Sequence, residues 1–444
     1  MKHLEETDPV IYDLIKKEEQ RQKDTLMMIP SENIASRAVE EAVGSCLGNK
    51  YAEGYPKRRY YQGQKYIDEV ELIAQERAKK LFSVEYANVQ PYSGSPANLA
   101  VYFALLKPED TIMGLSLAAG GHLTHGANMN ASSKFFHAVN YSVDKNGYID
   151  FDSLERLAVK HKPSIIVAGT TAYPRFLDWK RFSQIADKVG AYLLADISHI
   201  AGLVAAGVYP SPVDFAHIIT TTTHKTLRGP RGAMIMVGKK GLDKDPDLPV
   251  KIDKAIIPGL QGGPHLNTIA GIAVALKEAE SETFKEYAKA VVENAKVLEE
   301  ELKKYRFNLV TGGTDSHLLL IDLRNKGLLG NTAAEGLESA NIIVNRNSVP
   351  NDPNPPFFPS GIRIGTPGIT SRGMGKDQME KIAGFIHSVI SDLSQIAESL
   401  SFDLVSQRKR FVRRQIIEKS DKVKIIRQKV LRLCKDFPIK RVYI

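Results

Sequence analysis

Short apolar segments alternate with helical segments through the middle of this chain, and the alternation restricts the fold more than any other feature. The apolar segments lie at 86–92, 110–115, 164–169, 191–196, 217–222 and 233–238. Segments with helical periodicity, such as 67–82 and 95–106, separate them. Apolar strands joined through helices indicate a mostly parallel sheet that is buried on both faces. The sequence therefore predicts an α/β fold.

Three regions are expected along the chain. Residues 1–35 form an N-terminal arm, 36–280 a large domain, and 281–444 a smaller α/β C-terminal domain that ends in a basic helical tail. A helix is expected within 8–29, and further strands at 307–312, 316–323, 341–345 and 361–365. The signals for the arm helix are a cap at Asp8, a first-turn proline at Pro9, and an apolar face made of Val10, Ile11, Leu14 and Ile15.

The composition excludes several classes of protein. Cys46 and Cys434 are too few for a disulfide framework in 444 residues, which indicates a reducing compartment. The N-terminal stretch has no apolar segment of signal-peptide length, and no run of about eighteen apolar residues occurs in the sequence. A cytoplasmic protein that does not associate with membranes is expected.

The basic character of the chain belongs to its C-terminal tail. The net charge is +9, yet residues 406–444 alone carry fourteen Lys and Arg against three Asp and Glu, so the rest is close to neutral. Such a tail can bind nucleic acid or an anionic surface. It can also be an amphipathic helix docked on the body, which is favoured because charged runs are usually solvated faces. Nucleic acid is not expected as the primary partner. The apolar positions of the docked helix are Ile416, Val423, Ile426, Val430, Leu433 and Phe437.

Two residues at predicted strand ends suggest a site. Asp196 ends one apolar strand and Lys225 follows the next, so both reach the carboxyl edge of the sheet, where open α/β sheets bind ligands. His199 lies three residues after Asp196. From these residues alone, a structural ion pair is the simpler interpretation. The alternative is a Schiff-base lysine, with the acid serving the pyridinium nitrogen of pyridoxal phosphate.

Further segments favour an anionic ligand. Ser93, Gly94 and Ser95 precede a predicted helix, with Ser95 expected as the N-cap and Pro96 at the first helical position. Exposed amides, hydroxyls and a positive helix end form an anion cradle. The glycine-rich turn 258–264 can present further amides to phosphate, and Arg363 lies within an otherwise apolar strand. Its planar guanidinium matches a substrate carboxylate.

Taken together, these segments resemble one family. The motifs that carry the resemblance are KYAEGYP, RYYQG, NVQPYSGSPAN, GGHLTHG, TTTTHKTLRGPRG, QGGP, NRNSVPNDP and SGIRIGTPGITSRG. They are similar, in order, to those of serine hydroxymethyltransferase, a folate-linked enzyme family. The similarity extends from about residue 8 to about residue 400 and is looser beyond, where the tail is longer and more basic than the family pattern.

The resemblance implies a fold and an activity. The fold is that of a fold-type I pyridoxal phosphate-dependent transferase, similar to aspartate aminotransferase, with a mostly parallel seven-stranded sheet. The activity is reversible transfer of the serine hydroxymethyl group to tetrahydrofolate, giving glycine and methylenetetrahydrofolate. A homodimer or a dimer of dimers is implied. The alternative is a folate-independent, threonine-type aldolase that cleaves β-hydroxy amino acids with the same cofactor.

The resemblance also implies roles at the cofactor. Lys225 would form the aldimine with pyridoxal phosphate, Asp196 would pair with its ring nitrogen, and His122 would stack on its ring. Ser93, Gly94 and Ser95 would bind the phosphate, with Gly263 supplied by the neighbouring subunit. His199 and Thr171 would lie near the phenolic oxygen. Thr222 and His224 would tune the lysine, Arg231 would support its loop, and no metal is expected.

Substrate roles follow from the same resemblance. Arg363 and Ser31 would hold the serine carboxylate. Tyr51, Glu53 and Tyr61 would surround the hydroxymethyl group, with Tyr51 and Glu53 entering from the partner chain and Glu53 the leading candidate for proton transfer. The implied folate contacts are Leu117, Gly121, His122, Leu123, Asn347 and Phe357.

Overall fold

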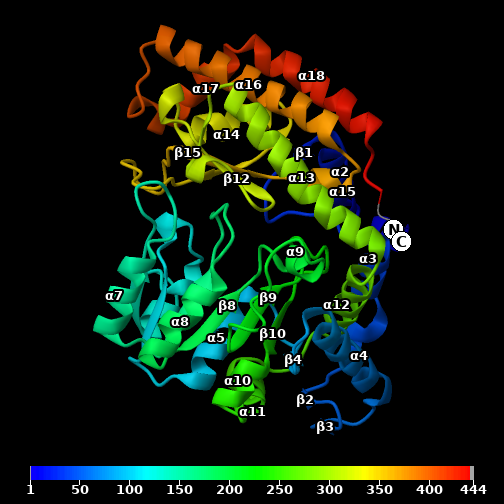
Figure 1. The fold of residues 1–444 in the computed structure, drawn as a ribbon. Helices are drawn as coiled ribbons and strands as arrows, with labels where there is room; N and C mark the ends of the chain where they lie inside the picture. Colours follow the sequence, from blue (N-terminus) through cyan, green and yellow to red (C-terminus); the bar gives the residue numbers. More distant parts are fainter. Residues whose placement is uncertain (1, 441–444) are drawn as a thin grey trace. The chain divides into compact units, whose positions relative to one another are not determined.

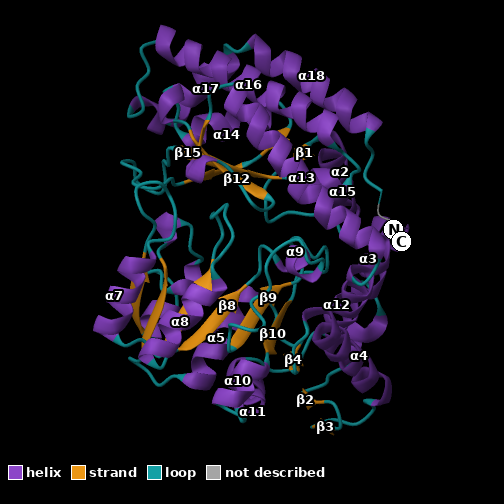
Figure 2. Cartoon of the chain, viewed as in Figure 1, coloured by secondary structure: helices purple, strands orange, loops and turns teal. Residues whose placement is uncertain are grey.

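The computed structural model describes residues 2–440, which divide into two compact units (Figures 1 and 2). The large unit comprises residues 33–292 and 313–317. The small unit comprises residues 2–32, 293–312 and 318–440. The N-terminal residues therefore group with the C-terminal part of the chain, and α13 (Glu282–Lys304) has its first part in one unit and its remainder in the other.

A seven-stranded sheet forms the centre of the large unit, as the sequence predicts. Its order is β4-β10-β9-β8-β7-β5-β6. All neighbours from β9 to β6 pair in parallel, whereas β10 is antiparallel to both β4 and β9. The strands are β4 (Tyr86–Asn88), β5 (Thr111–Leu115), β6 (His137–Tyr141), β7 (Ile165–Gly169), β8 (Tyr192–Asp196), β9 (Ile218–Thr222) and β10 (Ala233–Val237).

Helices cover this sheet on both faces, which explains why every residue of β7, β9 and β10 is buried. Figure 2 shows the strands enclosed by helices and loops. The helices are α3 (Arg37–Val43), α4 (Lys65–Phe82), α5 (Gly94–Leu105), α6 (Ser132–Phe135), α7 (Phe151–His161), α8 (Trp179–Val189), α9 (Ala201–Ala205), α10 (Lys239–Lys244), α11 (Leu248–Lys254) and α12 (Leu266–Ala279). A short hairpin of β2 (Gly54–Tyr55) and β3 (Arg58–Arg59) completes the unit.

The small unit contains an antiparallel sheet in the order β11-β12-β15-β14. Its strands are β11 (Asn308–Leu309), β12 (Leu318–Asp322), β15 (Gly361–Gly365) and β14 (Asn345–Asn347). Its helices are α1 (Lys2–Thr7), α2 (Pro9–Asp24), α14 (Gly330–Ser339), α15 (Pro367–Ser371), α16 (Lys376–Ser399), α17 (Arg410–Glu418) and α18 (Asp421–Asp436), together with the C-terminal part of α13.

The helix expected within 8–29 is confirmed as α2, which is capped by Asp8 and ends at Asp24. The strand that follows it, β1 (Leu26–Met27), was not predicted. β1 pairs in parallel with β13 (Ile342–Ile343), so the segment predicted as a strand at 341–345 contributes only its end to the main sheet.

The tail docks on the small unit through its apolar positions. Ile416, Val423, Ile426, Val430 and Leu433 are buried in the same core cluster as residues of α14 and α16, and Phe437 packs against it. The prediction of a docked amphipathic helix is confirmed, because apolar residues at helical spacing face the core while the charged residues remain outside. Among the described residues, no helix combines the length and apolar composition needed to cross a bilayer.

Candidate active site

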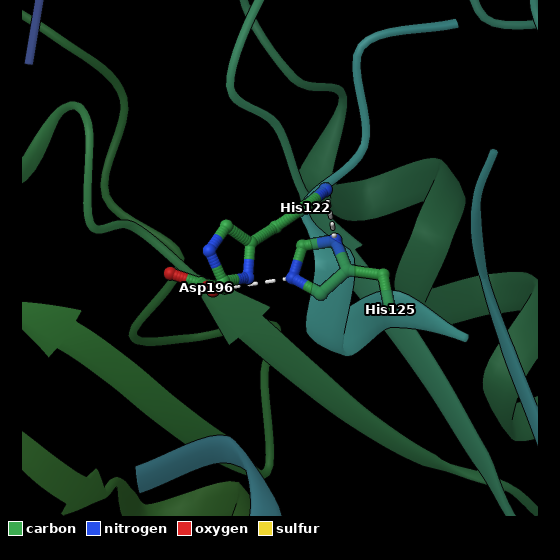
Figure 3. A group of neighbouring side chains, drawn as sticks. All are labelled: His122, His125 and Asp196. Atoms are coloured by element: carbon green, nitrogen blue, oxygen red, sulfur yellow. Dashed lines mark hydrogen bonds and ion pairs between the residues drawn. The ribbon is translucent and has the colours of Figure 1, made fainter. Parts of the chain in front are cut away.

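Asp196 ends β8 as a buried carboxylate with three hydrogen bonds. Asn98 Nδ2 donates at 2.9 Å, the Ser198 backbone N–H at 3.1 Å, and His125 Nε2 lies 3.1 Å away (Figure 3). Burial alone would raise the pKa of the carboxyl, but the hydrogen bonds from His125 and Ser198 outweigh burial and hold that pKa well below its ordinary value. Asp196 is therefore ionised at neutral pH and directs its charge into the site.

His125, which the sequence interpretation missed, is the partner that orients this carboxylate. The backbone N–H of His122 lies 3.3 Å from His125 Nδ1, and an N–H can only donate. Nδ1 therefore accepts, so the proton of a neutral His125 lies on Nε2, where it faces Asp196. Gly169 ends the neighbouring β7, where an added Cβ would lie 2.7 Å from Asp196 Cβ and 3.1 Å from the His125 ring, so glycine is required for this packing.

His122 is held as a neutral ring beside the same carboxylate. Burial lowers its pKa to about 4, although Asp196 acts in the opposite direction. Its Nδ1 lies 2.7 Å from the Thr124 hydroxyl, and Figure 3 shows both histidine rings next to Asp196. The ligand atoms of His122, His125 and Asp196 lie within 4.8 Å of one another, a spacing that could chelate a cation. The hydrogen bonds instead occupy these atoms with protons.

Lys225 lies three residues beyond β9, and its surroundings fix its position. Its Nζ donates to the Thr222 hydroxyl at 2.9 Å. Its backbone carbonyl accepts from Asn33 Nδ2 at 2.9 Å, and the same amide lies 2.7 Å from the Tyr287 hydroxyl. The guanidinium of Arg228 packs 4.0 Å from the centre of the Tyr287 ring. The loop that carries the lysine is therefore anchored from two distant segments.

The threonine hydroxyls of β9 have specific partners. Thr220 donates to Asn98 Oδ1 at 2.7 Å, and the amide nitrogen of Asn98 in turn binds Asp196. Thr222 accepts from Lys225, and its own backbone N–H donates to the Ser198 hydroxyl at 3.0 Å. One series of hydrogen bonds thus links Lys225, three residues beyond β9, with the carboxylate that ends β8. This explains why a buried strand contains so many hydroxyls.

The N-terminus of α5 lies beside the same site. Its N-cap residue differs from the prediction. Ser93, not Ser95, is the N-cap, and its side chain makes no capping hydrogen bond. The helix begins at Gly94, so Pro96 lies in the first turn but not at the first position. A Cβ on Gly94 would lie 2.8 Å from the Thr222 methyl group, so the helix end packs directly against the lysine loop. The amides of this turn and the positive helix end remain suited to an anion.

His224 and Arg231 form a pair beside Lys225. Arg231 NH1 lies 2.9 Å from His224 Nε2. A guanidinium only donates, so Nε2 is the acceptor and a neutral His224 carries its proton on Nδ1. Burial, and then the charges of Lys225 and Arg231, lower the pKa of His224 to about 3. His224 is therefore a neutral group beside the lysine.

His317, also missed from the sequence, contacts His199. Nε2 of His317 lies 3.3 Å from Nδ1 of His199, and both rings are buried. The segment 313–317 is fastened to the large unit because Thr314 Oγ1 and the Asp315 backbone N–H both bind the Pro174 carbonyl, at 3.1 and 2.9 Å. The Thr226 hydroxyl also donates to the His199 carbonyl at 3.0 Å, which connects this pair to the lysine loop.

The predicted site residues of the large unit that have not yet been described form two groups. Thr171 donates to the carbonyls of Gly120 and Gly121 at 3.2 Å, next to His122. Leu117 and Leu123 lie in short 3₁₀ turns at Leu117–Ala119 and Leu123–His125, with exposed fractions of 41 % and 42 %. These exposed leucines flank His122 in the sequence and provide an apolar surface.

The second group contains Tyr51, Glu53, Tyr61 and Gly263. The rings of Tyr51 and Tyr61 meet edge to face at 5.4 Å, and the Tyr61 hydroxyl lies 3.4 Å from Glu53. A Cβ on Gly263 would lie 3.2 Å from the Tyr51 ring. Tyr51 and Tyr61 are 58 % and 44 % exposed, so the structure gathers these four predicted residues into one exposed aromatic and acidic cluster.

Ser31, Arg363, Asn347 and Phe357 belong to the small unit. Arg363 is central in β15, where it pairs with Leu320 of β12 and Asn345 of β14. Its Nε donates to Asn345 Oδ1 at 3.1 Å, and burial lowers the pKa of its guanidinium to about 10, which leaves it charged at neutral pH. Pro30 packs against Gly365, so Ser31 and Arg363 come from neighbouring segments. Phe357 is 73 % exposed and lies 5.7 Å from the Arg346 guanidinium, and Asn347 ends β14.

The polar and aromatic groups of the large-unit site match the chemical groups of pyridoxal phosphate. An ionised carboxylate oriented by His125 suits a protonated ring nitrogen, and the neutral His122 offers a flat ring. The α5 turn, packed on Thr222, suits a phosphate, while the Lys225 amine suits an aldehyde. A metal centre would have to displace the proton between His125 and Asp196. Amine chemistry at a carbonyl cofactor is the reaction class that this arrangement supports.

Comparison with known proteins agrees with this geometry. Residues 4–386 match the family model of serine hydroxymethyltransferase. A protein of Acidothermus cellulolyticus named serine hydroxymethyltransferase is 55 % identical over 393 residues, which cover 88 % of this chain and 90 % of that protein. A protein of the same name from Wolbachia pipientis wMel is 51 % identical over 437 residues, covering 98 % of this chain and 96 % of that protein.

Proposed function

The chain belongs to the serine hydroxymethyltransferase family, and we propose that Lys225 and Asp196 are the groups through which it handles its cofactor. Its reaction is the reversible transfer of the serine hydroxymethyl group to tetrahydrofolate, giving glycine and methylenetetrahydrofolate, with pyridoxal phosphate as cofactor. Family membership supports this activity and not the folate-independent aldolase.

The observation that carries the proposal is the hydrogen-bonded chain from Lys225 through Thr222 and Ser198 to Asp196. Bound pyridoxal phosphate supplies an aldehyde for amines and a ring that accepts an electron pair when a bond to the substrate α-carbon breaks. Lys225 supplies the amine, and the ionised Asp196 holds the proton on the ring nitrogen. Ser93, Gly94 and Ser95 bind the phosphate through amides and hydroxyls at the positive end of α5.

The other cofactor roles follow the resemblance. His122 lies against the ring, Thr171 and His199 lie near the phenolic oxygen, and Thr222 and His224 tune Lys225 with support from Arg231. A neutral His224 adds no further positive charge beside the lysine. Leu117, Gly121, Leu123, Asn347 and Phe357 contact the folate.

We infer that the working molecule is a homodimer or a dimer of dimers in the cytoplasm. The cluster of Tyr51, Glu53, Tyr61 and Gly263 exposes two tyrosines, and large exposed aromatic surfaces are typical of interfaces. In the dimer, Tyr51, Glu53 and Gly263 complete the partner's site. Glu53 moves the proton at the hydroxymethyl group, in contact with the Tyr61 hydroxyl.

Arg363 provides the experiment that tests substrate binding. Arg363→Ala removes a bidentate, charge-assisted hydrogen-bond pair to the serine carboxylate. We therefore expect KM for serine to rise by about a hundredfold, which corresponds to a loss of about 3 kcal/mol of binding free energy. Arg363→Lys keeps the charge without the planar fork and should recover only part of that loss. KM and kcat are measured in the tetrahydrofolate-dependent cleavage of serine, with the absorption of bound cofactor recorded in parallel.

The matched control is Arg324→Ala, which removes an exposed arginine whose partner is Asp322 at the end of β12. It should leave KM unchanged. If Arg363→Ala leaves the affinity for serine unchanged, Arg363 does not bind the substrate carboxylate.

His317 is expected to be a positioning residue that acts through His199. Its Nε2 contacts His199 Nδ1, so it determines which nitrogen of His199 carries the proton that faces the cofactor. His317→Phe keeps an aromatic ring but loses this contact, and we expect kcat to fall by about tenfold to a hundredfold. His317→Gln keeps a side-chain amide that can donate or accept a hydrogen bond, and it should restore most of the activity.

The readout specific to this role is the pH dependence of the bound cofactor's absorption, which should shift in His317→Phe and return in His317→Gln. An unchanged absorption profile in a folded, cofactor-loaded His317→Phe enzyme would show that the residue serves packing alone.

A further inference from the structure

The exposed side of α18 is strongly basic, and it lies beyond residue 386, where the family match ends. The exposed cations of α18 are Lys422, Lys424, Arg427, Lys429, Arg432 and Lys435, referred to below as the basic surface. Lys424 and Arg432 are two turns apart on one side of the helix and Lys435 follows one turn later, so this row of charge extends about 16 Å. In Figure 1, α18 is the red helix along the outer side of the small unit.

The helix that carries this charge is firmly held. Its opposite face, with Val423, Ile426 and Val430, is buried in the core of the small unit. Ser420 caps its first turn by accepting from the Val423 N–H at 3.1 Å and donates to Asp392 at 2.5 Å. At the other end, the Arg372 guanidinium donates to the carbonyls of Cys434 and Phe437, each at 2.8 Å. The basic surface is therefore a preorganised platform, which needs little ordering when it binds a partner.

Few acidic groups neutralise the basic surface. Lys424 pairs with Asp421 at 3.0 Å, but within residues 2–440 the other five cations have no carboxylate within ion-pair distance. Concentrated, unneutralised positive charge on a body that is otherwise near neutral attracts a polyanion. The tail 406–444, which includes α18, carries fourteen Lys and Arg against three Asp and Glu, and accounts for the net positive charge of the chain.

An exposed aromatic side chain narrows the choice of polyanion. Phe411 of α17 is 59 % exposed and lies between Arg410 and Arg414 on the helix surface. An aromatic ring beside arginines is suited to stacking on an unpaired base. An anionic membrane is disfavoured, because a membrane-surface helix inserts its apolar face and that of α18 is already buried in the protein.

We propose that the basic surface and Phe411 bind single-stranded nucleic acid. The cations of α18 contact the phosphates of the nucleic acid, and Phe411 of α17 stacks on one of its bases. This second activity is independent of the catalytic site. It requires no change in the hydroxymethyl transfer reaction.

The test uses the full-length, cofactor-loaded enzyme and a fluorescently labelled single-stranded uridine RNA. Binding is followed by anisotropy as salt is raised from about 50 to about 200 mM, and affinity should fall steeply. A variant carrying Lys422→Gln, Lys429→Gln, Arg432→Gln and Lys435→Gln should reduce the slope of log K against log salt by about 3, since each phosphate contact contributes roughly 0.7. Phe411→Ala should weaken binding by about tenfold on single strands and leave duplex RNA unaffected.

The control removes an equal charge elsewhere, with Lys107→Gln, Lys145→Gln, Lys160→Gln and Lys180→Gln on exposed positions of the large unit. It should bind RNA as the parent does. All variants should keep serine turnover, so a loss of RNA binding is separable from a loss of fold. Equal losses in both quadruple variants, or no measurable RNA binding at low salt, would overturn the proposal. Tight binding to phosphatidylserine vesicles with no binding to RNA would assign the basic surface to membranes instead.

Discussion

Replacement of Lys225 by alanine is expected to lower the tetrahydrofolate-dependent turnover of serine by about four orders of magnitude or more, because it removes the amine that we propose forms and re-forms the bond to the cofactor. The neighbours of Lys225 remain in place. Asn33 binds its backbone carbonyl, and Thr222 retains the Ser198 contact. The variant should therefore fold and still bind pyridoxal phosphate without a covalent link. Turnover is measured under saturating serine, and the covalent link by borohydride reduction followed by intact-mass analysis.

One further variant distinguishes the reactive amine of Lys225 from its positive charge, and another serves as a control. Lys225→Arg keeps a cation near Thr222 but cannot condense with an aldehyde, so it should be as inactive as Lys225→Ala. Lys239→Ala removes an exposed lysine of the same unit and should retain full activity. Multiple turnovers by Lys225→Arg, or borohydride trapping at a different lysine, would show that another residue carries the cofactor.

Asp196→Asn should lower kcat by about a thousandfold, which corresponds to about 4 kcal/mol of transition-state stabilisation. Asparagine has one acceptor oxygen, so it can keep the bond from Ser198 or the bond from Asn98 but not both, because these donors bind different oxygens of Asp196. It also lacks the negative charge that we propose holds a proton on the cofactor ring. Because the pKa of Asp196 lies well below its ordinary value, this charge is present throughout the neutral range. The loss should appear equally at every pH at which the enzyme is folded.

The kinetic measurement is paired with the absorption spectrum of the bound cofactor, which should change because the ring nitrogen is no longer protonated. Asp178→Asn is the control, since Asp178 caps α8 through a hydrogen bond to the Arg181 N–H and asparagine caps equally well. Unchanged kcat and spectrum in Asp196→Asn would remove this carboxylate from the reaction.

The sequence was sufficient to identify the strand ends that carry Asp196 and Lys225. Apolar strands joined by helices place their carboxyl ends at one edge of a parallel sheet, so residues that follow such strands converge regardless of loop details. The docked tail was predictable for a similar reason, since helical periodicity is a local property. The turn at the start of α5 and Arg363 were likewise predicted from the residues themselves, as an anion cradle and a carboxylate-binding group. Family resemblance then assigned these groups, together with His122, to a particular cofactor and substrate.

The partners that orient these groups could not be found in this way. His125 follows His122 by three residues, and the HLTH spacing is its only local signal. His317 lies 118 residues from His199, so its contact depends on the path of the intervening chain. The strand at Leu26–Met27 likewise exists because Ile342–Ile343 pair with it. Long-range pairing of this kind leaves no periodic trace in the sequence.

The segment 313–317 belongs to the large unit although the chain on both sides of it belongs to the small unit. The boundaries after residues 32, 292, 312 and 317 therefore divide each unit into separate stretches of sequence. A gene fragment that ends at residue 292 would lack His317 and the hydrogen bonds of Thr314 and Asp315 to the Pro174 carbonyl, so it would not encode the whole large unit. To exchange one unit with that of a homologue, a chimaera would have to replace all the stretches of sequence that make up that unit at once.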